Sequence, residues 1–441
     1  RLGNAIHIVW VGLIVMVFAL GYGLVRLGLL IGLCWSGARR RRVVARWNGW
    51  SLRKLLEVLG ASFIKMGQVM STRPDLFAPE IIAQLKRLQD RLPAFSFARV
   101  ERTIAEDTGK PLGETYAEFD RTPVAAASVA QVHRARLLDG REVAVKVLRP
   151  NVRRQVERDR SLLLFGAKVI ALHPRLRRSD PVGHTEHFVN AIHDQTDLRI
   201  EAENYRRFHA NFASWTTVKF PEVLAPVTER VLTMEFIRGT KIDAQPEARK
   251  LPLAEVVRRC MFQMCFDDGF LHADMHPGNM LVDDDGRLVL FDVGLAKHLH
   301  EDVLIQFIDM GKCLTMGTPG DLVAHLRRFH TYMGDVDWDA LSKDVEVFAL
   351  KFRAQSASDL DYGVLFNEMF AIGRRYHVRP VTDMTLVLVA MVTSQGIGKM
   401  LDPGVNVFAH VARHLVPILM KRNERVPETD AARTATARAG A

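Results

Sequence analysis

One lysine and three oxygen-bearing side chains, in a fixed order along the chain, constrain its fold more than any other feature. Lys146 lies in VAVKV, where the flanking β-branched residues predict a strand. Asp274 and Asn279 lie five residues apart in HADMHPGN, and Asp292 ends the strand-like run RLVLFD. Carboxylate and amide oxygens are ligands that Mg²⁺ prefers, and a lysine can bind phosphate oxygens. The chain must therefore fold so that distant segments meet around one phosphate group.

In phosphoryl transfer, one carboxylate orients or deprotonates the nucleophile, and further oxygen ligands hold the metal against the phosphates. Asp274 is the expected catalytic carboxylate, and Asn279 and Asp292 are the expected metal ligands. The order of these three residues is that of protein kinases. His272 and His276 flank Asp274, but two histidines on a loop do not indicate zinc, and His272 is expected to hold the loop backbone through hydrogen bonds.

Lys146 is expected to point into a cleft, because side chains along a strand alternate between its faces. A carboxylate must hold the lysine there. Glu201 is the first candidate and Glu203 the second, and only one can point at the lysine because they face about 200° apart on a helix. Lys146, Asp274 and Glu201 form the expected catalytic set.

The loop that would cover the phosphates carries alanines where glycines would be expected, since residues 125–128 read AAAS. Alanine in place of glycine removes the conformations with φ > 0 and stiffens a loop by roughly 0.5–1 kcal/mol per site. We therefore expect a rigid nucleotide lid, and Ala126→Gly is expected to change nucleotide preference or to release a latent kinase activity. The expected nucleotide-binding residues are Ala125, Ala126, Ala127, Ser128 and Lys146, with Glu235 and Ile237 of a hinge near residues 235–239.

Taken together, the motifs resemble those of the UbiB family of atypical kinase-like proteins, also called the ADCK or aarF-domain family. They are ASFIKMGQVMSTRPDLFAPEI, AAASVAQVHRA, VAVKVLRP, EAENYRRF, FLHADMHPGNMLV and LVLFDVGLA. The most specific is Lys65-Met66-Gly67-Gln68, which looks like the family's K-x-G-Q signature. The resemblance implies an α+β, bilobal protein-kinase-like fold with a helical N-terminal extension, carrying Lys65 and Gln68, that covers the active site.

The resemblance also implies ATP or ADP and Mg²⁺ as cofactors. It implies an atypical kinase or ATPase that supports ubiquinone (coenzyme Q) biosynthesis or isoprenoid-lipid handling at a membrane, with ubiquinone-biosynthesis proteins or a lipid-like substrate as partners. A Ser/Thr protein kinase and a non-catalytic nucleotide-binding scaffold are the alternatives. The sequence departs from the family pattern in that Gln195-Thr196-Asp197 replaces E-x-D, Met275 replaces a common proline, and Val293 replaces an aromatic residue.

An apolar segment near the start favours a membrane location, on the cytoplasmic face of a bacterial inner membrane or an organelle equivalent. No charge occurs from Ile8 to Val25, and these 18 residues are about the minimum for crossing a bilayer. Arg39–Arg42 follow, on the side expected to face the cytoplasm. A cleaved signal peptide and a buried or surface-lying helix are the alternatives. The net charge of +10 fits anionic lipid, whereas basic and aromatic residues do not interleave, so a nucleic-acid platform is not expected.

The chain is expected to divide into five parts. Phe188–Phe212 is expected to form helix throughout, because it contains neither glycine nor proline. Met384–Lys399 is expected to be a core helix rather than a membrane span. The five parts are a membrane segment over residues 1–35, a helical extension carrying K-x-G-Q over 36–115, a kinase-like N-lobe over 116–238, a mostly helical C-lobe over 239–422 and a disordered tail over 423–441.

Overall fold

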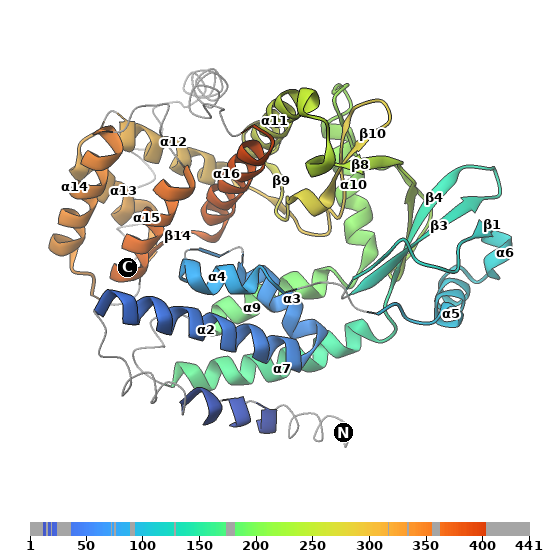
Figure 1. Ribbon diagram of the computed structural model, residues 1–441, viewed down its shortest axis with the longest axis horizontal. Coiled ribbons are helices and arrows are strands. Elements are labelled where there is room, and N and C mark those ends of the chain that lie inside the picture. The colour runs from blue at the N-terminus through green and yellow to red at the C-terminus, as the bar shows by residue number, and fades with distance from the viewer. Residues whose placement is uncertain are drawn as a thin grey trace, which may run out of the picture.

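The computed structural model describes residues 12–14, 16–18, 20–23, 37–71, 73–74, 76–88, 93–127, 129–172, 181–315, 317–332, 335–354 and 362–402. These residues form one lobe built on a sheet and one built mostly from helices, with a group of N-terminal helices running alongside (Figure 1). The expected bilobal α+β fold is confirmed.

A six-stranded antiparallel sheet forms the first lobe, in the order β1-β3-β4-β7-β6, with β2 paired to β3. The strand expected at Lys146 is present as β4, and it pairs with β3 in an antiparallel hairpin. The strands are β1 (Tyr116–Phe119), β2 (Ala125–Ala126), β3 (Ala130–Leu137), β4 (Glu142–Leu148), β6 (Val223–Val227) and β7 (Val231–Glu235).

The alternation of side chains along β4 separates two apolar clusters. The three valines of β4 pack with residues of α5 (Phe97–Thr108) on one face of the sheet. Ala144 and Leu148 face the other way and join the large core that continues into the helical lobe. Lys146 shares their face because strand side chains repeat every two residues. This face lies towards α10 (Leu198–Asn211), the helix that carries Glu201.

Among the described residues between β4 and β5, the helices are α7 (Val152–Ala171), α9 (Pro181–Asp194) and α10. The expectation of one continuous helix over residues 188–212 was wrong, because the chain turns between α9 and α10. Asp197 caps α10, and its Oδ1 accepts a hydrogen bond from the backbone N–H of Arg199 at 3.0 Å. An aspartate that accepts a hydrogen bond from a free backbone amide favours the start of a new helix at that point. A search for glycine and proline alone does not detect such a helix start.

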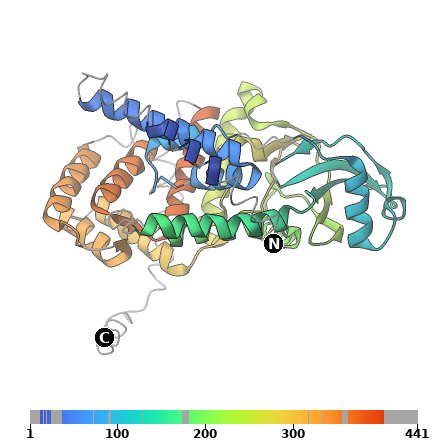
Figure 2. The same cartoon turned by 90° about the horizontal axis from the view of Figure 1, so that it is seen from below.

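The N-terminal extension lies alongside α7 and α9 and reaches towards the helical lobe (Figures 1 and 2). Its helices between residues 37 and 85 share an apolar cluster with α7 and α9, which includes Leu56, Phe63 and Phe188. The backbone carbonyl of Pro74 accepts a hydrogen bond from Arg374 of the helical lobe, which joins the extension to that lobe. The extension comprises α2 (Gly37–Leu59), α3 (Ala61–Ser71), α4 (Pro79–Leu85), α5 and α6 (Leu112–Thr115).

The second lobe is mostly helical, with three small sheets that shape its loops. Its helices are α11 (Glu247–Phe262), α12 (Glu301–Thr315), α13 (Pro319–Phe329), α14 (Trp338–Ala354), α15 (Tyr362–Tyr376) and α16 (Thr382–Leu401), with short helices η1 (Ile242–Ala244), η2 (Gln263–Asp267) and η3 (Pro277–Asn279). Its sheets are β5 (Val218–Lys219) with β11 (Leu288–Leu290), β10 (Met280–Asp283) and β8 (Gly239–Lys241); β9 (Phe270–His272) with β12 (Ala296–His298); and β13 (His330–Tyr332) with β14 (Val378–Pro380).

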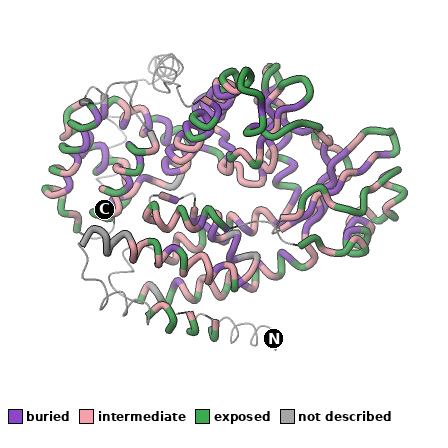
Figure 3. Tube along the Cα trace, viewed as in Figure 1, coloured by how far each residue is buried: buried purple, intermediate pink, exposed green. Residues whose placement is uncertain are grey.

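The helix α16 contains the segment Met384–Lys399. In length and apolar character it could cross a membrane, and among the described helices it alone meets both criteria. However, 61% of its apolar window is buried, and it packs against α11 and α15 inside the helical lobe (Figure 3). This burial supports the expectation of a core helix.

Most of the apolar segment over residues 6–35 lies outside the described residues, and so does the tail over 423–441. The described residues between 12 and 23 are helical, and the hydroxyl of Tyr22 donates to Oδ1 of Asn48 in α2 at 2.8 Å. The described part of the segment therefore lies against the extension.

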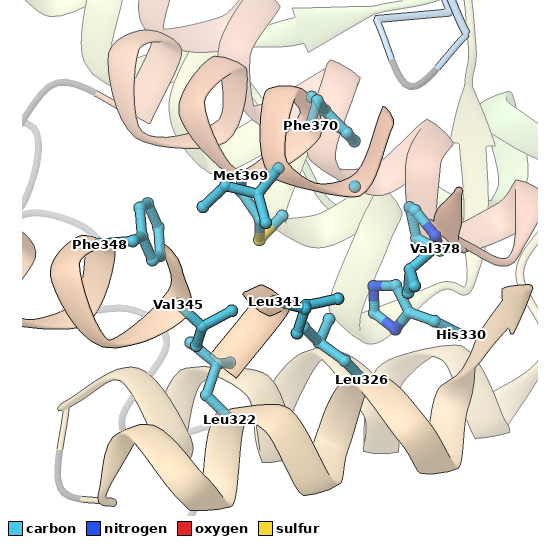
Figure 4. Close-up of a pocket in the computed structure, with 12 residues that line it drawn as sticks. Leu322, Leu326, His330, Leu341, Val345, Phe348, Met369, Phe370 and Val378 are labelled. Atoms are coloured by element: carbon cyan, nitrogen blue, oxygen red, sulfur yellow. The ribbon is translucent and has the colours of Figure 1, made fainter. Parts of the chain in front are cut away.

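A small cavity of about 30 Å³ lies among α13, α14, α15 and β14 (Figure 4). Its walls are apolar except for His330, whose buried Nδ1 has no hydrogen-bond partner in the part of the chain that the structure describes. The volume gives room for a water molecule but not for a nucleotide or a lipid. The candidate active site is elsewhere, between the two lobes.

Candidate active site

Lys146 lies at the centre of a charged cluster that joins the two lobes. Its Nζ donates to both carboxylate oxygens of Glu201 at 2.8 Å and to Oδ1 of Asp292 at 3.0 Å. The lysine and Glu201 side chains are only 12% and 6% exposed, whereas Asp292 is 46% exposed. Burial alone would lower the pKa of Lys146, but the carboxylates of Asp292 and Glu201 outweigh it and raise the pKa. The lysine therefore stays charged next to an accessible carboxylate.

The structure selects Glu201 rather than Glu203 as the partner of the lysine. Glu201 lies in the first turn of α10 and faces the sheet, where it is buried. Glu203 points to solvent with 73% of its side chain exposed, and it binds Arg206 on the same helix. The first candidate from the sequence is therefore the one in contact, because the two residues face different sides of α10.

Two further residues of α10 position Asp292, and the sequence analysis did not identify them. The hydroxyl oxygen of Tyr205 accepts the backbone N–H of Asp292 at 3.0 Å, and Nδ2 of Asn204 donates to the carbonyl of Val293 at 2.9 Å. Asp292 has a φ of +52°, a left-handed backbone that non-glycine residues rarely adopt. Residues 201, 204 and 205 share one face of a helix by their spacing of three and four, and that spacing was the available signal.

Burial also determines the state of Tyr205. Its ring is 1% exposed, and burial raises the pKa of its hydroxyl. The tyrosine is therefore neutral and acts as a fixed support for the backbone that carries Asp292.

His272 holds the loop of Asp274 in place, as the sequence suggested. Its Nε2 lies 3.0 Å from the carbonyl oxygen of Phe291, and its Nδ1 accepts the backbone N–H of Asp274 at 3.3 Å. The ring must therefore carry its proton on Nε2, and burial lowers its pKa and keeps it neutral. The Nδ1 of His276 accepts the backbone N–H of Gly278 at 3.0 Å.

The amide of Asn279 closes the same loop. Its Nδ2 donates to the backbone carbonyl of Asp274 at 3.1 Å, which leaves the amide oxygen as the remaining polar atom of the side chain. The strand β11 then leads to Asp292, whose segment is held through the hydrogen bond from Phe291 N–H to the carbonyl of Asn279 at 3.0 Å. A carboxylate and an amide oxygen on tied segments suit a hard cation such as Mg²⁺.

The alanine-rich loop forms a tight hairpin over the start of β3. Ala125 and Ala126 form β2, and the N–H of Ala127 donates to the carbonyl of Ala130 at 2.8 Å. Ser128, one of the expected nucleotide-binding residues, lies outside the described residues. The side chain of Arg149, a residue that the sequence analysis did not consider, donates to the carbonyl of Ala127 at 2.8 Å. The hairpin is therefore fixed by hydrogen bonds as well as by its alanines.

The expected hinge lies at the end of β7, between the two lobes. The carboxylate of Glu235 binds Lys219, and its backbone N–H donates to the carbonyl of Glu222 at 2.8 Å. Ile237 is half-buried two residues further along the chain. The side chain of Glu235 is thus engaged with protein, and its role towards a nucleotide stays a prediction.

The expected cover of the site is described only in part. The backbone of Lys65 belongs to α3, but its side chain is outside the described part of the structure. Gln68 is half-buried, and its carbonyl accepts from the hydroxyl of Ser71 at 2.6 Å. Among the described side chains, no hydrogen bond joins Gln68 to Asp274 or Asp292. The cover of the active site by these residues stays a prediction.

The three departures from the family pattern fall at positions with clear structural environments. Met275 and Val293 are buried in the main core, at 5% and 0% exposure, so both act in packing. Asp197 caps α10, and Gln195 lies beside Gly294, where a Cβ would be 3.8 Å from its Cγ. None of these residues displaces Lys146 or its partners.

Comparison with known proteins links this geometry to described families. A family model of the ABC1 atypical kinase-like domain matches residues 87–315, and one of the UbiB helical domain matches residues 345–406. A "Probable protein kinase UbiB" from Marinobacter nauticus is 31% identical over 397 residues, which cover 85% of this chain and 71% of that protein. The Arabidopsis thaliana "Protein ACTIVITY OF BC1 COMPLEX KINASE 7, chloroplastic" is 31% identical over 394 residues, which cover 87% of this chain but 56% of that protein. The solved complex of Rv3197 with erythromycin, from Mycobacterium tuberculosis, is 18% identical with a TM-score of 0.45, over 76% of this chain and 88% of that one.

Proposed function

The chain belongs to the ABC1/UbiB family of atypical kinase-like proteins, and on this premise we propose that it binds ATP with Mg²⁺ and either hydrolyses it or transfers its terminal phosphoryl group to a small molecule. The observation that carries the proposal is the contact of Lys146 with both Glu201 and Asp292, at 2.8 and 3.0 Å. A buried, charged lysine beside an accessible carboxylate is the arrangement that binds a metal–triphosphate.

Each residue of the site has one role in the proposal. Lys146 binds the phosphate oxygens, and Glu201 holds the lysine in place and balances its charge. Asn279 and Asp292 supply the oxygen ligands for Mg²⁺, which when bound neutralises charge between the phosphates. Asp274 orients the attacking hydroxyl or water and accepts its proton.

The backbone supports of these residues make the site pre-organised. His272 and Asn279 both bind the main chain of Asp274, while Tyr205 binds the main chain of Asp292. Because these hydrogen bonds exist before nucleotide arrives, little reorganisation is needed to bind it.

We propose further that the chain supports ubiquinone biosynthesis, or the handling of a related isoprenoid lipid, at a membrane. The UbiB and BC1 complex kinase names of the relatives support this. The extension beside the site, if it covers the cleft through Lys65 and Gln68, excludes large protein substrates and favours a small or lipid-like one. The apolar N-terminal segment and the basic run that follows it fit anionic lipid.

The proposal is tested by ATP hydrolysis with the purified full chain, with and without cardiolipin-containing liposomes. Asp292→Asn should reduce the rate by more than about 100-fold, because a metal ligand contributes several kcal/mol to the transition state. Asp285→Asn is the matched control, since Asp285 lies on an exposed turn and binds Arg287 on the surface. Equal rates for both variants would contradict the proposed site.

Other outcomes favour the two alternatives. Phosphorylation of peptides by the wild type, lost in Asp274→Asn, would indicate a Ser/Thr protein kinase. Tight nucleotide binding without turnover, even with liposomes and a lipid-like phenol, would indicate a scaffold.

A further inference from the structure

We propose that Arg149 is a positioning residue that braces the alanine-rich lid and ties it to the N-terminal extension, so that the extension influences how tightly nucleotide is held. The inference rests on the proposed function, because it assigns a role to the lid of the nucleotide site. Arg149 follows β4 directly, three residues after Lys146.

Arg149 binds the turn of the lid through both its side chain and its main chain. Its Nε donates to the carbonyl of Ala127 at 2.8 Å, and its backbone N–H donates to the carbonyl of Val129 at 2.8 Å. The N–H of Ala127 is itself bound to Ala130 across the hairpin. The lid therefore cannot move away from β4 without breaking hydrogen bonds to Arg149.

The same guanidinium also binds residues 93–95, which we call the strap. Its Nη2 donates to the carbonyl of Pro93 at 3.0 Å, and its central carbon lies 5.6 Å from the ring centroid of Phe95. The buried side chain of Gln131 holds the strap from the other side, because it accepts the N–H of Phe95 at 3.1 Å and donates to its carbonyl at 3.4 Å. Gln131 lies in β3 and pairs with Ala126 of β2 across the hairpin, so the strap is bound to the strand against which the lid is paired.

The geometry of the guanidinium makes this bridge specific to arginine. The group is planar, and its donors point in fixed directions, so Nε and Nη2 can serve two carbonyls at once. A lysine carries the same charge on a single nitrogen and cannot span the two carbonyls while stacking on a ring. Arg149→Lys therefore removes the bridge between the two carbonyls but keeps the positive charge.

The strap continues the extension that carries K-x-G-Q. It begins five residues after Leu88, whose side chain packs against Gly67. Because the strap belongs to the same extension and binds Arg149, we expect a shift of the extension to reach the lid through Arg149. A lid that is held in place before nucleotide binds loses less freedom on binding, so the brace should slow nucleotide release.

The test compares Arg149→Met, Arg149→Lys and Arg153→Met in the full chain. Arg153 is the matched control, because it is the second residue of α7, binds Glu229 on the surface and takes no part in the described hydrogen bonds of the lid and the strap. Hydrogen exchange of peptides covering residues 124–130 is measured without nucleotide, and release of a fluorescent ADP is measured with Mg²⁺. Thermal unfolding of each variant confirms that it is folded.

Both Arg149 variants should exchange faster over residues 124–130 than the wild type and than Arg153→Met. They should also release ADP roughly tenfold faster, the change expected when one charge-assisted hydrogen bond to a binding loop is lost. In the ATP assay the KM should rise more than kcat falls, since the residues that contact the phosphates are unaltered.

Two results would contradict the proposed role of Arg149 in bracing the lid. Unchanged exchange in both Arg149 variants would mean that the lid does not depend on these hydrogen bonds. Wild-type behaviour of Arg149→Lys alone would assign the effect to charge rather than to the bridge. Failure of the wild type to bind ADP would instead contradict the proposed function, and the exchange measured without nucleotide would still decide on the brace.

Discussion

Replacing Gly67 by alanine tests why a glycine stands in the K-x-G-Q helix. A Cβ at this position would lie 2.3 Å from Cδ1 of Leu88 and 2.7 Å from Cδ1 of Leu56. Both leucines are buried, at 5% and 2% exposure, so neither can move without displacing other core side chains. Overpacking of this kind costs about 1–3 kcal/mol of unfolding free energy.

Gly166 provides the matched control for this change. It also lies inside a helix, α7, but an added Cβ would have no atom within 4 Å. Alanine is favoured over glycine inside a helix by about 1 kcal/mol, and this gain applies at both positions. Gly166→Ala should therefore stabilise by about 1 kcal/mol, while Gly67→Ala should be neutral or destabilise by up to about 2 kcal/mol. The difference between the two variants isolates the packing cost.

Calorimetry of the full chain provides the measurement. A change of 1 kcal/mol shifts the melting temperature of a large domain by about 2–4 °C, so Gly67→Ala should melt at least a few degrees below Gly166→Ala. If the two variants melt together, the helices have room for a methyl group at Gly67. The signature glycine would then need another explanation than close packing.

Three further changes each perturb one contact. Tyr205→Phe removes the acceptor of the Asp292 amide, and we expect a loss of about 1–3 kcal/mol in calorimetry and a higher Mg²⁺ requirement in the ATP assay. Burial, together with the nearby His325, lowers the pKa of His330 from 6.5 to about 3. Below pH 6.5 the imidazole is therefore protonated in the unfolded state but neutral in the folded state. The free energy of unfolding should therefore decrease by about 2 kcal/mol as the pH is lowered from 6.5 to 5. In urea unfolding, the free energy of unfolding of His330→Leu should depend less on pH. Val345→Ile adds a methylene beside the 30 Å³ cavity and should raise the free energy of unfolding by up to about 0.8 kcal/mol in urea unfolding. A lower free energy of unfolding would mean that the cavity wall cannot accommodate the added group.

The parts of the site that depend on local pattern could be predicted from the sequence. The alternation of VAVKV placed Lys146 on the face opposite the valines, the motif HADMHPGN placed Asp274 on a loop, and the run RLVLFD placed Asp292 at the end of a strand. Helix geometry showed that Glu201 and Glu203 cannot both reach the lysine. Which of the two does so depends on how α10 rotates against the sheet, and only the packing of its apolar face settles that.

The parts that depend on long-range contacts could not be predicted. Arg149 ends a strand in a basic region, and nothing local shows that the carbonyls of Ala127 and Pro93 will lie within its reach. Tyr205 could have been found from its spacing to Glu201, but an aromatic residue at that position is also what a buried helix face requires. The turn before α10 was missed because Asp197 acts through a cap rather than through a helix-breaking residue.

The rigidity of the lid therefore has two separate physical sources. The sequence analysis attributed the rigidity to the alanines. A Cβ atom restricts the backbone conformations of a residue, which is worth roughly 0.5–1 kcal/mol per site. The structure adds a hydrogen bond from the charged side chain of Arg149 to the carbonyl of Ala127, which is the stronger kind, and one from its backbone N–H to the carbonyl of Val129. Ala126 already lies in a paired strand, so a glycine there would loosen the lid less than removal of the brace. If the brace acts as proposed, tertiary contacts contribute more than the alanines to the stiffness of this loop.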